Sequence, residues 1–179
     1  MSGELVKSLL ERTARALPAW HVADLDGWWL RHSPGCSWWV GTVLPHSAAS
    51  PEDLAKRIGG AEQFYASRNA AARFQISPGA CPAELDAVLA ERGYRRHSVI
   101  SLQVASTAQV VAPPGSLRVR PDDQPTRPWF ESWNAVQGHV TDARMLHRVE
   151  QPPAYASALR LYERAGFREL SPFHYRTAG

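Results

Sequence analysis

Apolar and polar residues follow one another along the chain with periods that predict a mixture of helices and strands. In residues 4–17 the leucines recur at helical spacing and Pro18 follows, so we expect a helix that ends before the proline. Ser50 and Pro51 open the next periodic segment, and they are typical of the N-cap and the first position of a helix. The pattern predicts helices at residues 4–17, 51–67, 82–91 and 154–164.

Aromatic and β-branched residues mark the expected strands. Residues 28–31 and 38–43 lie on either side of the sequence SPGCS, which predicts a hairpin with its turn at Pro34 and Gly35. Helices and strands therefore alternate, and we expect a mixed α/β fold. Further strands are expected at residues 73–77, 95–104, 116–120 and 167–176.

The segment STAQVVAPPGS breaks this periodicity. Its two prolines and one glycine, within residues 106–116, are typical of a linker. We therefore expect an N-terminal lobe at residues 1–105, a linker at residues 106–116 and a second part at residues 117–179.

The two sides of this linker share a short sequence. LAERGYRRHS, at residues 89–98, matches LYERAGFRELS, at residues 161–171, when Ala165 is counted as an insertion. Each copy has the end of a helix, a glycine, an aromatic residue and then a strand. This alignment places Ala90 opposite Tyr162, and the shared order favours an internal duplication over coincidence.

Composition limits the class of protein. The chain has 179 residues, 44% hydrophobic and 21% charged, which is typical of a globular protein. No run reaches the roughly 18 consecutive apolar residues of a membrane-spanning helix, and the first residues are amphipathic, so we expect a cytoplasmic protein with no membrane partner. The net charge of +3 is dispersed, which argues against nucleic acid but suits an anionic cofactor or a small anionic partner.

Cysteine and histidine positions predict no metal site. Cys36 and Cys81 lack partners at C-x-x-C spacing, and His139 and His147 lack an acid or a cysteine at metal-binding spacing. We read the two cysteines as buried or unengaged thiols.

The second copy of the shared sequence resembles a known motif. ALRLYERAGF, at residues 158–167, is similar to the A-x-x-L-Y-x-x-x-G-F ending of the GNAT superfamily of N-acetyltransferases, and FHYR at residues 173–176 resembles the family's final strand. In the first part, GWWLRHSP, EQFYASRNAAARFQIS and LDAVLAERGY resemble the N-terminal lobe of a bacterial tandem, histone-acetyltransferase-like branch. The resemblance implies a GNAT-like α+β fold, in which a lobe with a mixed, mainly antiparallel sheet precedes a truncated C-terminal GNAT half.

The resemblance also implies an activity, the transfer of an acetyl group from acetyl-CoA to an amine that the chain does not identify. In the family, the tyrosine of the L-Y motif donates a proton to the departing thiolate, and by position this catalytic residue is Tyr162. From its helix alone, Tyr162 beside Leu161 reads instead as a packed aromatic residue. Both interpretations stay open.

One element of the family is missing from the sequence. The family holds the pyrophosphate of acetyl-CoA in a Q/R-x-x-G-x-G/A loop that opens a helix after a strand, and residues 120–154 contain no match. Gly59 and Gly60, in RIGGA, fall inside a predicted helix and read as a packing site. We infer that the middle of the second half has been lost near Tyr155, so the cofactor-binding residues are unknown.

This loss predicts how the chain is completed. The final strand lacks its usual neighbours, so we expect it to join the sheet of the first lobe or to pair with a second chain in a homodimer. The adjacent tryptophans, Trp28 with Trp29 and Trp38 with Trp39, place one face in the core, and the other face is covered within the monomer or forms an interface. Two functions remain: an N-acetyltransferase, or a non-catalytic remnant that acts as a binding or oligomerisation module.

Overall fold

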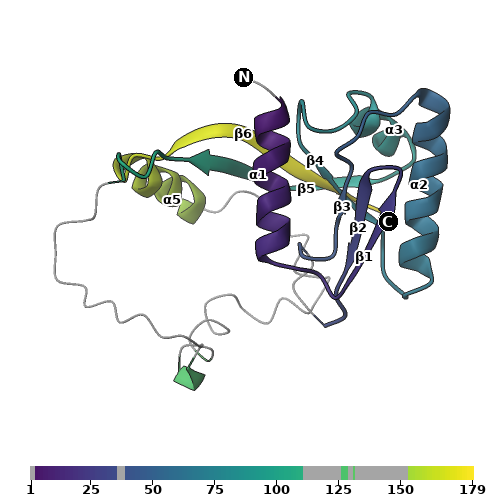
Figure 1. The fold of residues 1–179 in the computed structure, drawn as a ribbon, viewed down its shortest axis with the longest axis horizontal. Coiled ribbons are helices and arrows are strands. Elements are labelled where there is room, and N and C mark those ends of the chain that lie inside the picture. The colour runs from purple at the N-terminus through teal and green to yellow at the C-terminus, as the bar shows by residue number, and fades with distance from the viewer. Residues whose placement is uncertain (1–2, 36–38, 111–125, 129–130, 132–152) are drawn as a thin grey trace. The chain divides into compact units, whose positions relative to one another are not determined.

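The computed structural model describes residues 3–35, 39–110, 126–128, 131 and 153–179 (Figure 1). The chain divides into two units, Met1–Val104 together with Glu169–Gly179, and Ala105–Arg168. The expected strand at residues 116–120, and Cys36, Trp38, His139 and His147, lie outside the described residues. The organisation into a lobe, a linker and a truncated half stays a prediction.

The first unit contains three helices and six strands among the described residues. Most begin and end within a residue or two of the positions expected from the sequence, because caps and prolines fix them locally. They are α1 (Gly3–Ala16), β1 (His21–Leu25), β2 (Trp28–His32), β3 (Val43–Leu44), α2 (Pro51–Ala66), β4 (Arg73–Ile76), α3 (Leu85–Glu91), β5 (Arg95–Val104) and β6 (Arg168–Thr177).

The six strands form a single sheet in the order β1-β2-β3-β4-β6-β5. Neighbouring strands are antiparallel from β1 to β3 and between β4 and β6, whereas β3 and β4 are parallel. The expected mixed, mainly antiparallel sheet is confirmed. Because parallel strands need a crossover connection, α2 lies between β3 and β4 in the chain and forms a βαβ unit with them.

The first hairpin differs from the expected one. Its tight turn is at Asp26 and Gly27, which both have positive φ (51° and 83°), and it joins β1 to β2. Positive φ at both central residues is the geometry of a type I′ turn, for which Asp-Gly is a preferred sequence. The expected partner of residues 28–31 is present only as the two residues of β3, which pair with Trp29 and Leu30.

Helices cover both faces of the sheet. The side chains of β2 point alternately to the two faces, so each face packs against its own helices. Trp28 and Leu30 point into one core together with Leu54 and Ile58 of α2 and Leu89 of α3. On the other face the Arg15 guanidinium of α1 lies 4.9 Å from the Trp29 ring centroid. The Arg31 guanidinium donates to the carbonyl oxygens of Ala14 (3.3 Å) and Leu17 (2.7 Å). One tryptophan of the first pair is therefore in the core and the other lies under α1.

The final strand joins the sheet of the first half, as expected. β6 pairs with β4 from Arg73↔Thr177 to Ile76↔His174 and lies between β4 and β5. Beyond the strand, the Ala178 N–H donates to the Ala72 carbonyl at 3.1 Å. A segment separated from β5 by more than sixty residues of sequence thus completes the sheet.

The repeated sequence forms the same turn twice. In the first copy Gly93 (φ 84°) and Tyr94 donate to the carbonyls of Ala90 and Leu89. In the second copy, at the end of α5 (Pro153–Arg164), Gly166 (φ 90°) and Phe167 donate to the carbonyls of Glu163 and Tyr162. Both are Schellman motifs, in which the glycine follows the last helical turn.

This shared geometry corrects the sequence alignment. The Tyr94 amide binds the carbonyl five residues earlier, that of Leu89, and the Phe167 amide binds that of Tyr162 at the same spacing. Two identical helix ends leave no room for an inserted residue, so Tyr162 corresponds to the buried Leu89 and not to Ala90.

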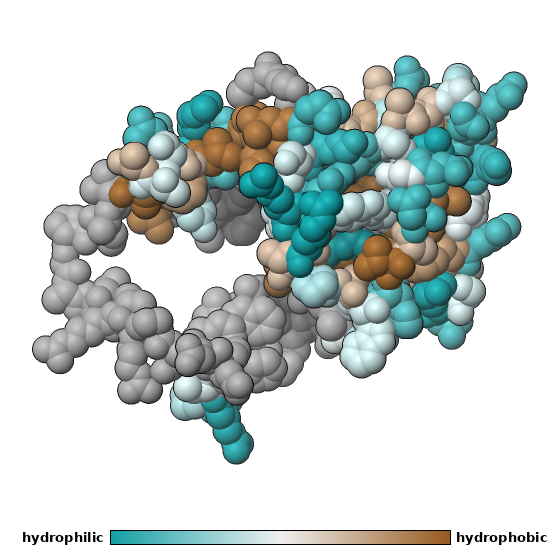
Figure 2. All heavy atoms as spheres, in the orientation of Figure 1, coloured by the Kyte–Doolittle hydropathy of each residue, from teal (hydrophilic) through white to brown (hydrophobic). Residues whose placement is uncertain are grey.

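The surface in the view of Figure 2 is largely polar over the first unit, with apolar residues in small groups. Two exposed apolar side chains, Trp20 (80%) and Val22 (58%), lie at and beside β1, which is an edge of the sheet. In the part of the chain that the structure describes, no helix has the length and apolar character to cross a membrane.

Candidate functional site

Tyr162 lies on α5 in the second unit. Its side chain is 49% exposed, and its ring packs edge-on against the Phe167 ring with the centroids 5.8 Å apart. Within the described part of the chain its hydroxyl forms no hydrogen bond. The ring therefore has a packing contact with Phe167, and about half of the residue is exposed.

A second candidate site lies at the edge of the sheet where the parallel strands β3 and β4 end. Ligands of open α/β sheets bind in the crevice outside the carboxyl ends of parallel strands. Here a pocket of about 340 Å³ lies between the start of α1 and the connections that follow β3 and β4. Its lining is Glu4, Lys7, His46, Ser47, Ala48, Ala49, Gly79, Ala80, Cys81, Pro82, Ala83 and Glu84. We call this pocket the β3/β4 crevice.

The β3/β4 crevice adjoins the start of α2, the helix that follows strand β3. The phosphate loop implied by the resemblance also opens a helix after a strand. A phosphate cradle needs free backbone N–H groups there. Ser50 takes one of them, because its Oγ accepts from the Asp53 N–H at 3.2 Å, while the Leu54 N–H makes the first hydrogen bond of the helix itself. Pro51 has no N–H to offer. The first turn of α2 therefore has few free backbone N–H groups that could bind a ligand.

The charge at this helix end also opposes a phosphate. Glu52 and Asp53 stand in the first turn, where their carboxylates already satisfy the positive end of the helix dipole. The hydrogen bond from the Ser50 hydroxyl holds the pKa of Asp53 below its usual value, so this carboxyl group is ionised at neutral pH. In the crevice itself, Glu4 and Glu84 face a single lysine, Lys7. The residues present do not fit the pyrophosphate of acetyl-CoA.

Helix α1 closes one side of the crevice. A Cβ atom on Gly3 would clash with the carbonyl oxygen of Gly79, in the turn that follows β4. Gly79 itself has φ 76°, a conformation that favours glycine. The start of α1 is therefore in direct contact with the β4–α3 connection and narrows the crevice from that side.

His46 is the unusual residue of the crevice. Its side chain is 2% exposed, and neither ring nitrogen has a hydrogen-bond partner. Nδ1 lies 3.5 Å from Oε1 of Glu11. Burial lowers the pKa of His46 more than Glu11 raises it, so the ring is neutral near pH 7. A neutral imidazole can accept a proton, but this one is enclosed.

Cys81 lines the same crevice without forming a reactive pair with His46. Burial raises the pKa of the Cys81 thiol, so the thiol stays protonated and is a weak nucleophile. No hydrogen bond joins Cys81 to His46 among the described residues. The same part of the chain also contains no cluster of histidine, cysteine and carboxylate side chains that could hold a metal ion.

The sequence did not single out His46. The residue follows the two-residue strand β3, whose preceding tryptophans had suggested a longer strand. Its burial depends on α1, which is far away in the sequence. The only local signal is the apolar run ending in Pro45 just before it.

The sheet order, the βαβ unit at its centre and the helices on both faces define a mixed α/β fold. No family model and no curated protein sequence matches the chain. Among solved structures it is similar to a GCN5-related N-acetyltransferase from Kribbella flavida, with a TM-score of 0.66 at 11% identity. The match covers 100% of this chain and 96% of that one. The chain therefore has a fold similar to that of this N-acetyltransferase, in agreement with the GNAT-like fold expected from the motif in residues 158–167.

Proposed function

We propose that this chain is a GNAT-fold protein that acts as a binding or oligomerisation module and does not transfer acetyl groups. The observation that carries the proposal is the self-capped, acidic first turn of α2 at the β3/β4 crevice. Acetyl-CoA is a polyanion, and its pyrophosphate would meet the Asp53 carboxylate where the fold requires positive potential.

The test is binding of acetyl-CoA to the full chain, measured by calorimetry and by thermal melting. A ligand that binds the native state alone raises its stability by RT ln(1 + [L]/Kd). We expect no heat of binding and no change in melting temperature at about 1 mM acetyl-CoA, which is the upper end of the usual range of enzyme Michaelis constants. Saturable binding in the micromolar range would refute the proposal.

A double variant sharpens this test. Glu52→Gln with Asp53→Asn removes both first-turn charges and keeps the side-chain shapes. If charge is the obstacle, the variant binds acetyl-CoA or pyrophosphate more strongly than the wild type does. The matched control is Glu91→Gln, an exposed carboxylate at the end of α3. An equal response from both variants would mean that the first turn of α2 is not what decides binding.

A second candidate is the N-acetyltransferase activity itself, with acetyl-CoA as cosubstrate and an unidentified amine as acceptor. It is favoured by the half-exposed Tyr162 at the motif position, the residue that would donate a proton to the departing thiolate. Thiol release from acetyl-CoA, measured with a panel of amines, tests it. Activity that is lost in Tyr162→Phe at an unchanged melting temperature would establish this second function and overturn the first.

Oligomerisation is the part of the proposal that needs its own measurement. The edge strand β1 carries exposed Val22, with exposed Trp20 immediately before it, and an edge strand can pair with a second copy. We propose a homodimer through this edge. Sedimentation equilibrium should give twice the monomer mass, and Val22→Lys should shift the protein to monomer because charged residues on an edge oppose pairing. A monomer at high protein concentration would exclude the dimer.

A further inference from the structure

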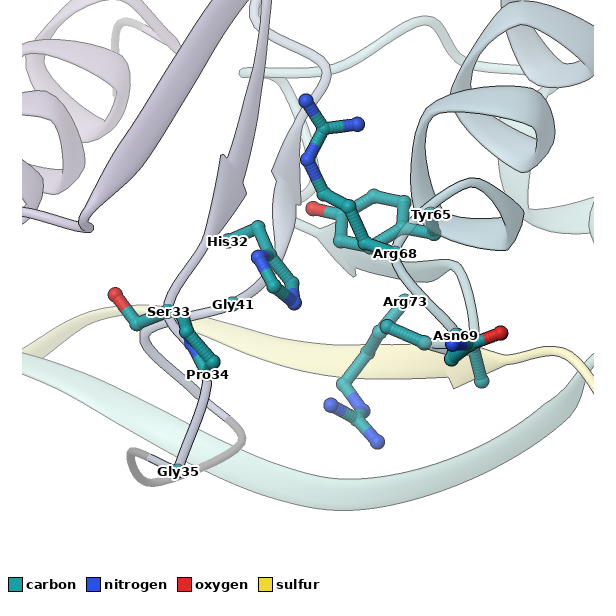
Figure 3. A pocket seen from close by; sticks show the side chains of 11 residues that line it. His32, Ser33, Pro34, Gly35, Gly41, Tyr65, Arg68, Asn69 and Arg73 are labelled. Carbon is teal, nitrogen blue, oxygen red and sulfur yellow. The ribbon is translucent and has the colours of Figure 1, made fainter.

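A different pocket lies at the other end of α2. It occupies about 380 Å³, a size that suits a small molecule. Figure 3 shows His32, Ser33 and Pro34 on one side and Tyr65, Arg68, Asn69 and Arg73 on the other. The end of β2, the end of α2 and the start of β4 therefore all contribute to it. We call this pocket the α2-end pocket.

The charged side chains that line this pocket are cationic. Arg68 and Arg73 both contribute, and none of the described lining residues is an aspartate or a glutamate. Burial lowers the pKa of Arg73, and the phenols of Tyr65 and Tyr175 raise it. Burial raises the pKa of both tyrosines, so they are neutral at physiological pH. The described lining therefore carries positive charge and no carboxylate.

The pocket also contains a hydrogen-bonding group without a partner among the described residues, on His32. His32 Nδ1 is buried and has no hydrogen-bond partner. Burial and the charge of Arg68 lower the pKa of His32, so the ring is neutral and carries one N–H. Buried polar atoms without partners are rare in native structures, and a bound ligand is one explanation for them.

The Arg68 side chain keeps part of its donor capacity. Its Nη1 donates to the carbonyl of Phe64 (2.7 Å) and to Ser67 Oγ (3.0 Å), while its guanidinium lies 3.8 Å from the centroid of the Phe64 ring. Nε and Nη2 have no partner in the described part of the chain. Arg73 is held more firmly, because its Nε donates to Thr177 Oγ1 at 3.0 Å.

A helix C-terminus normally disfavours an anion, because its free carbonyls carry partial negative charge. At this end of α2 the carbonyls are already occupied. The N–H groups of Ser67, Asn69 and Ala70 donate to the carbonyls of Gln63, Ala66 and Tyr65, and the Arg68 guanidinium takes that of Phe64. The last turn therefore presents little free acceptor surface to the pocket.

From these observations we infer that the α2-end pocket binds a small molecule that carries a carboxylate or a phosphate group. The oxyanion would accept from His32 and from Nε and Nη2 of Arg68, because a guanidinium donates strong, charge-assisted hydrogen bonds to such groups. The site is separate from the β3/β4 crevice, since the two lie at opposite ends of α2. It does not depend on whether the protein transfers acetyl groups.

Thermal melting and calorimetry of the full chain test this inference with two probes, inorganic phosphate and succinate. Sodium chloride at equal ionic strength is the reference. We expect a saturable rise in melting temperature with at least one probe beyond the effect of chloride. A response to phosphate alone identifies a phosphate site, and a response to succinate alone identifies a carboxylate site.

Two variants locate the binding. Arg68→Gln should weaken the responsive probe by about tenfold, which corresponds to the loss of one charge-assisted hydrogen bond. Arg12→Gln, which removes an exposed arginine on α1, should leave the affinity unchanged. The inference is overturned if neither probe acts beyond chloride, or if both variants weaken binding equally.

Discussion

The Asp86 carboxylate on α3 accepts a hydrogen bond of 2.7 Å from Nε of Arg176 on β6, although the two residues are 90 positions apart. The same Oδ1 atom lies 2.8 Å from Nε2 of His174. The last strand is therefore fixed to the first lobe by side chains as well as by its pairing with β4. Arg176 also donates to the Tyr94 carbonyl at 3.1 Å, which ties the strand to the helix end that precedes β5.

Replacing Arg176 tests this connection. Arg176→Gln should lower the free energy of unfolding by about 1–2 kcal/mol, because a partly buried ion pair loses one partner. Chemical denaturation measures the loss. Arg168→Gln, an exposed position at the start of the same strand, is the control and should have no measurable effect. Equal effects would mean that Asp86 contributes nothing specific.

The Asp86 carboxylate also predicts behaviour in acid. The hydrogen bond from Arg176 lowers its pKa to about 2. A lowered pKa means that the unfolded chain binds the proton more tightly, so this stabilisation is complete above about pH 4 and is lost as the pH falls towards 2. Asp86 is partly exposed, and screening limits its contribution to about 1 kcal/mol. Asp86→Asn should flatten the stability profile between these pH values, and an unchanged slope would contradict the assignment.

His97 should make stability depend on pH at higher values than Asp86 does. Burial, followed by the charges of Arg73, Arg95 and His174, lowers its pKa to about 4. The unfolded chain then binds protons more tightly between about pH 6.5 and 4, so stability falls as the pH decreases through this range. Because His97 is only half-buried, solvent screening reduces the expected loss to about 2 kcal/mol, and the loss is absent in His97→Gln. His21→Gln, an exposed imidazole on β1, should retain the loss.

Two adjacent glycines in α2 should respond oppositely to alanine. A Cβ on Gly59 would contact nothing within 4 Å, so Gly59→Ala should stabilise the helix by about 0.5–1 kcal/mol. A Cβ on Gly60 would lie 2.9 Å from Cδ2 of Leu25, which must move. We expect Gly60→Ala to be less stable than Gly59→Ala by about 1 kcal/mol. Equal melting temperatures would show that Gly60 is not a packing site.

The buried imidazole of His46 gives a further prediction. Neither of its nitrogens makes a hydrogen bond to the described residues, and Glu11 lies 3.5 Å from Nδ1 of a ring that is neutral at pH 7, so His46→Leu removes an unsatisfied polar group without opening a large cavity. We expect the free energy of unfolding to rise by about 1 kcal/mol at pH 7 and by more at pH 5, where the wild-type ring is protonated on unfolding. Denaturation at the two pH values checks this, and a loss of stability would mean that His46 has a partner in the native protein.

Local signals made much of the fold predictable. α2 was expected because Ser50 and Pro51 form a cap, and β5 was expected because its alternation ends where the linker begins. The β1–β2 hairpin was not predicted, because the tryptophan-rich segments suggested a different hairpin. The dipeptide Asp26-Gly27 is nevertheless a strong signal for a two-residue turn.

The candidate sites could not be predicted in the same way. The β3/β4 crevice is built from α1 and from the connections after β3 and β4, and the α2-end pocket joins Ser33 to Arg73. No sequence spacing connects such residues, because the fold alone brings them together. The comparison of Tyr162 with Ala90 failed for a related reason: a backbone hydrogen-bond register decides which residues are equivalent.

The place of β6 between β4 and β5 has a consequence for how the protein is made. Among the described strands β6 is the one neighbour of β5, and during synthesis β5 leaves the ribosome well before β6 does. Until β6 arrives, β5 is unpaired and one edge of β4 is open, and open strand edges promote association between nascent chains. Such distant pairing also slows folding. Expression at low temperature, or with chaperones that hold unpaired strands, should therefore raise the yield of folded protein.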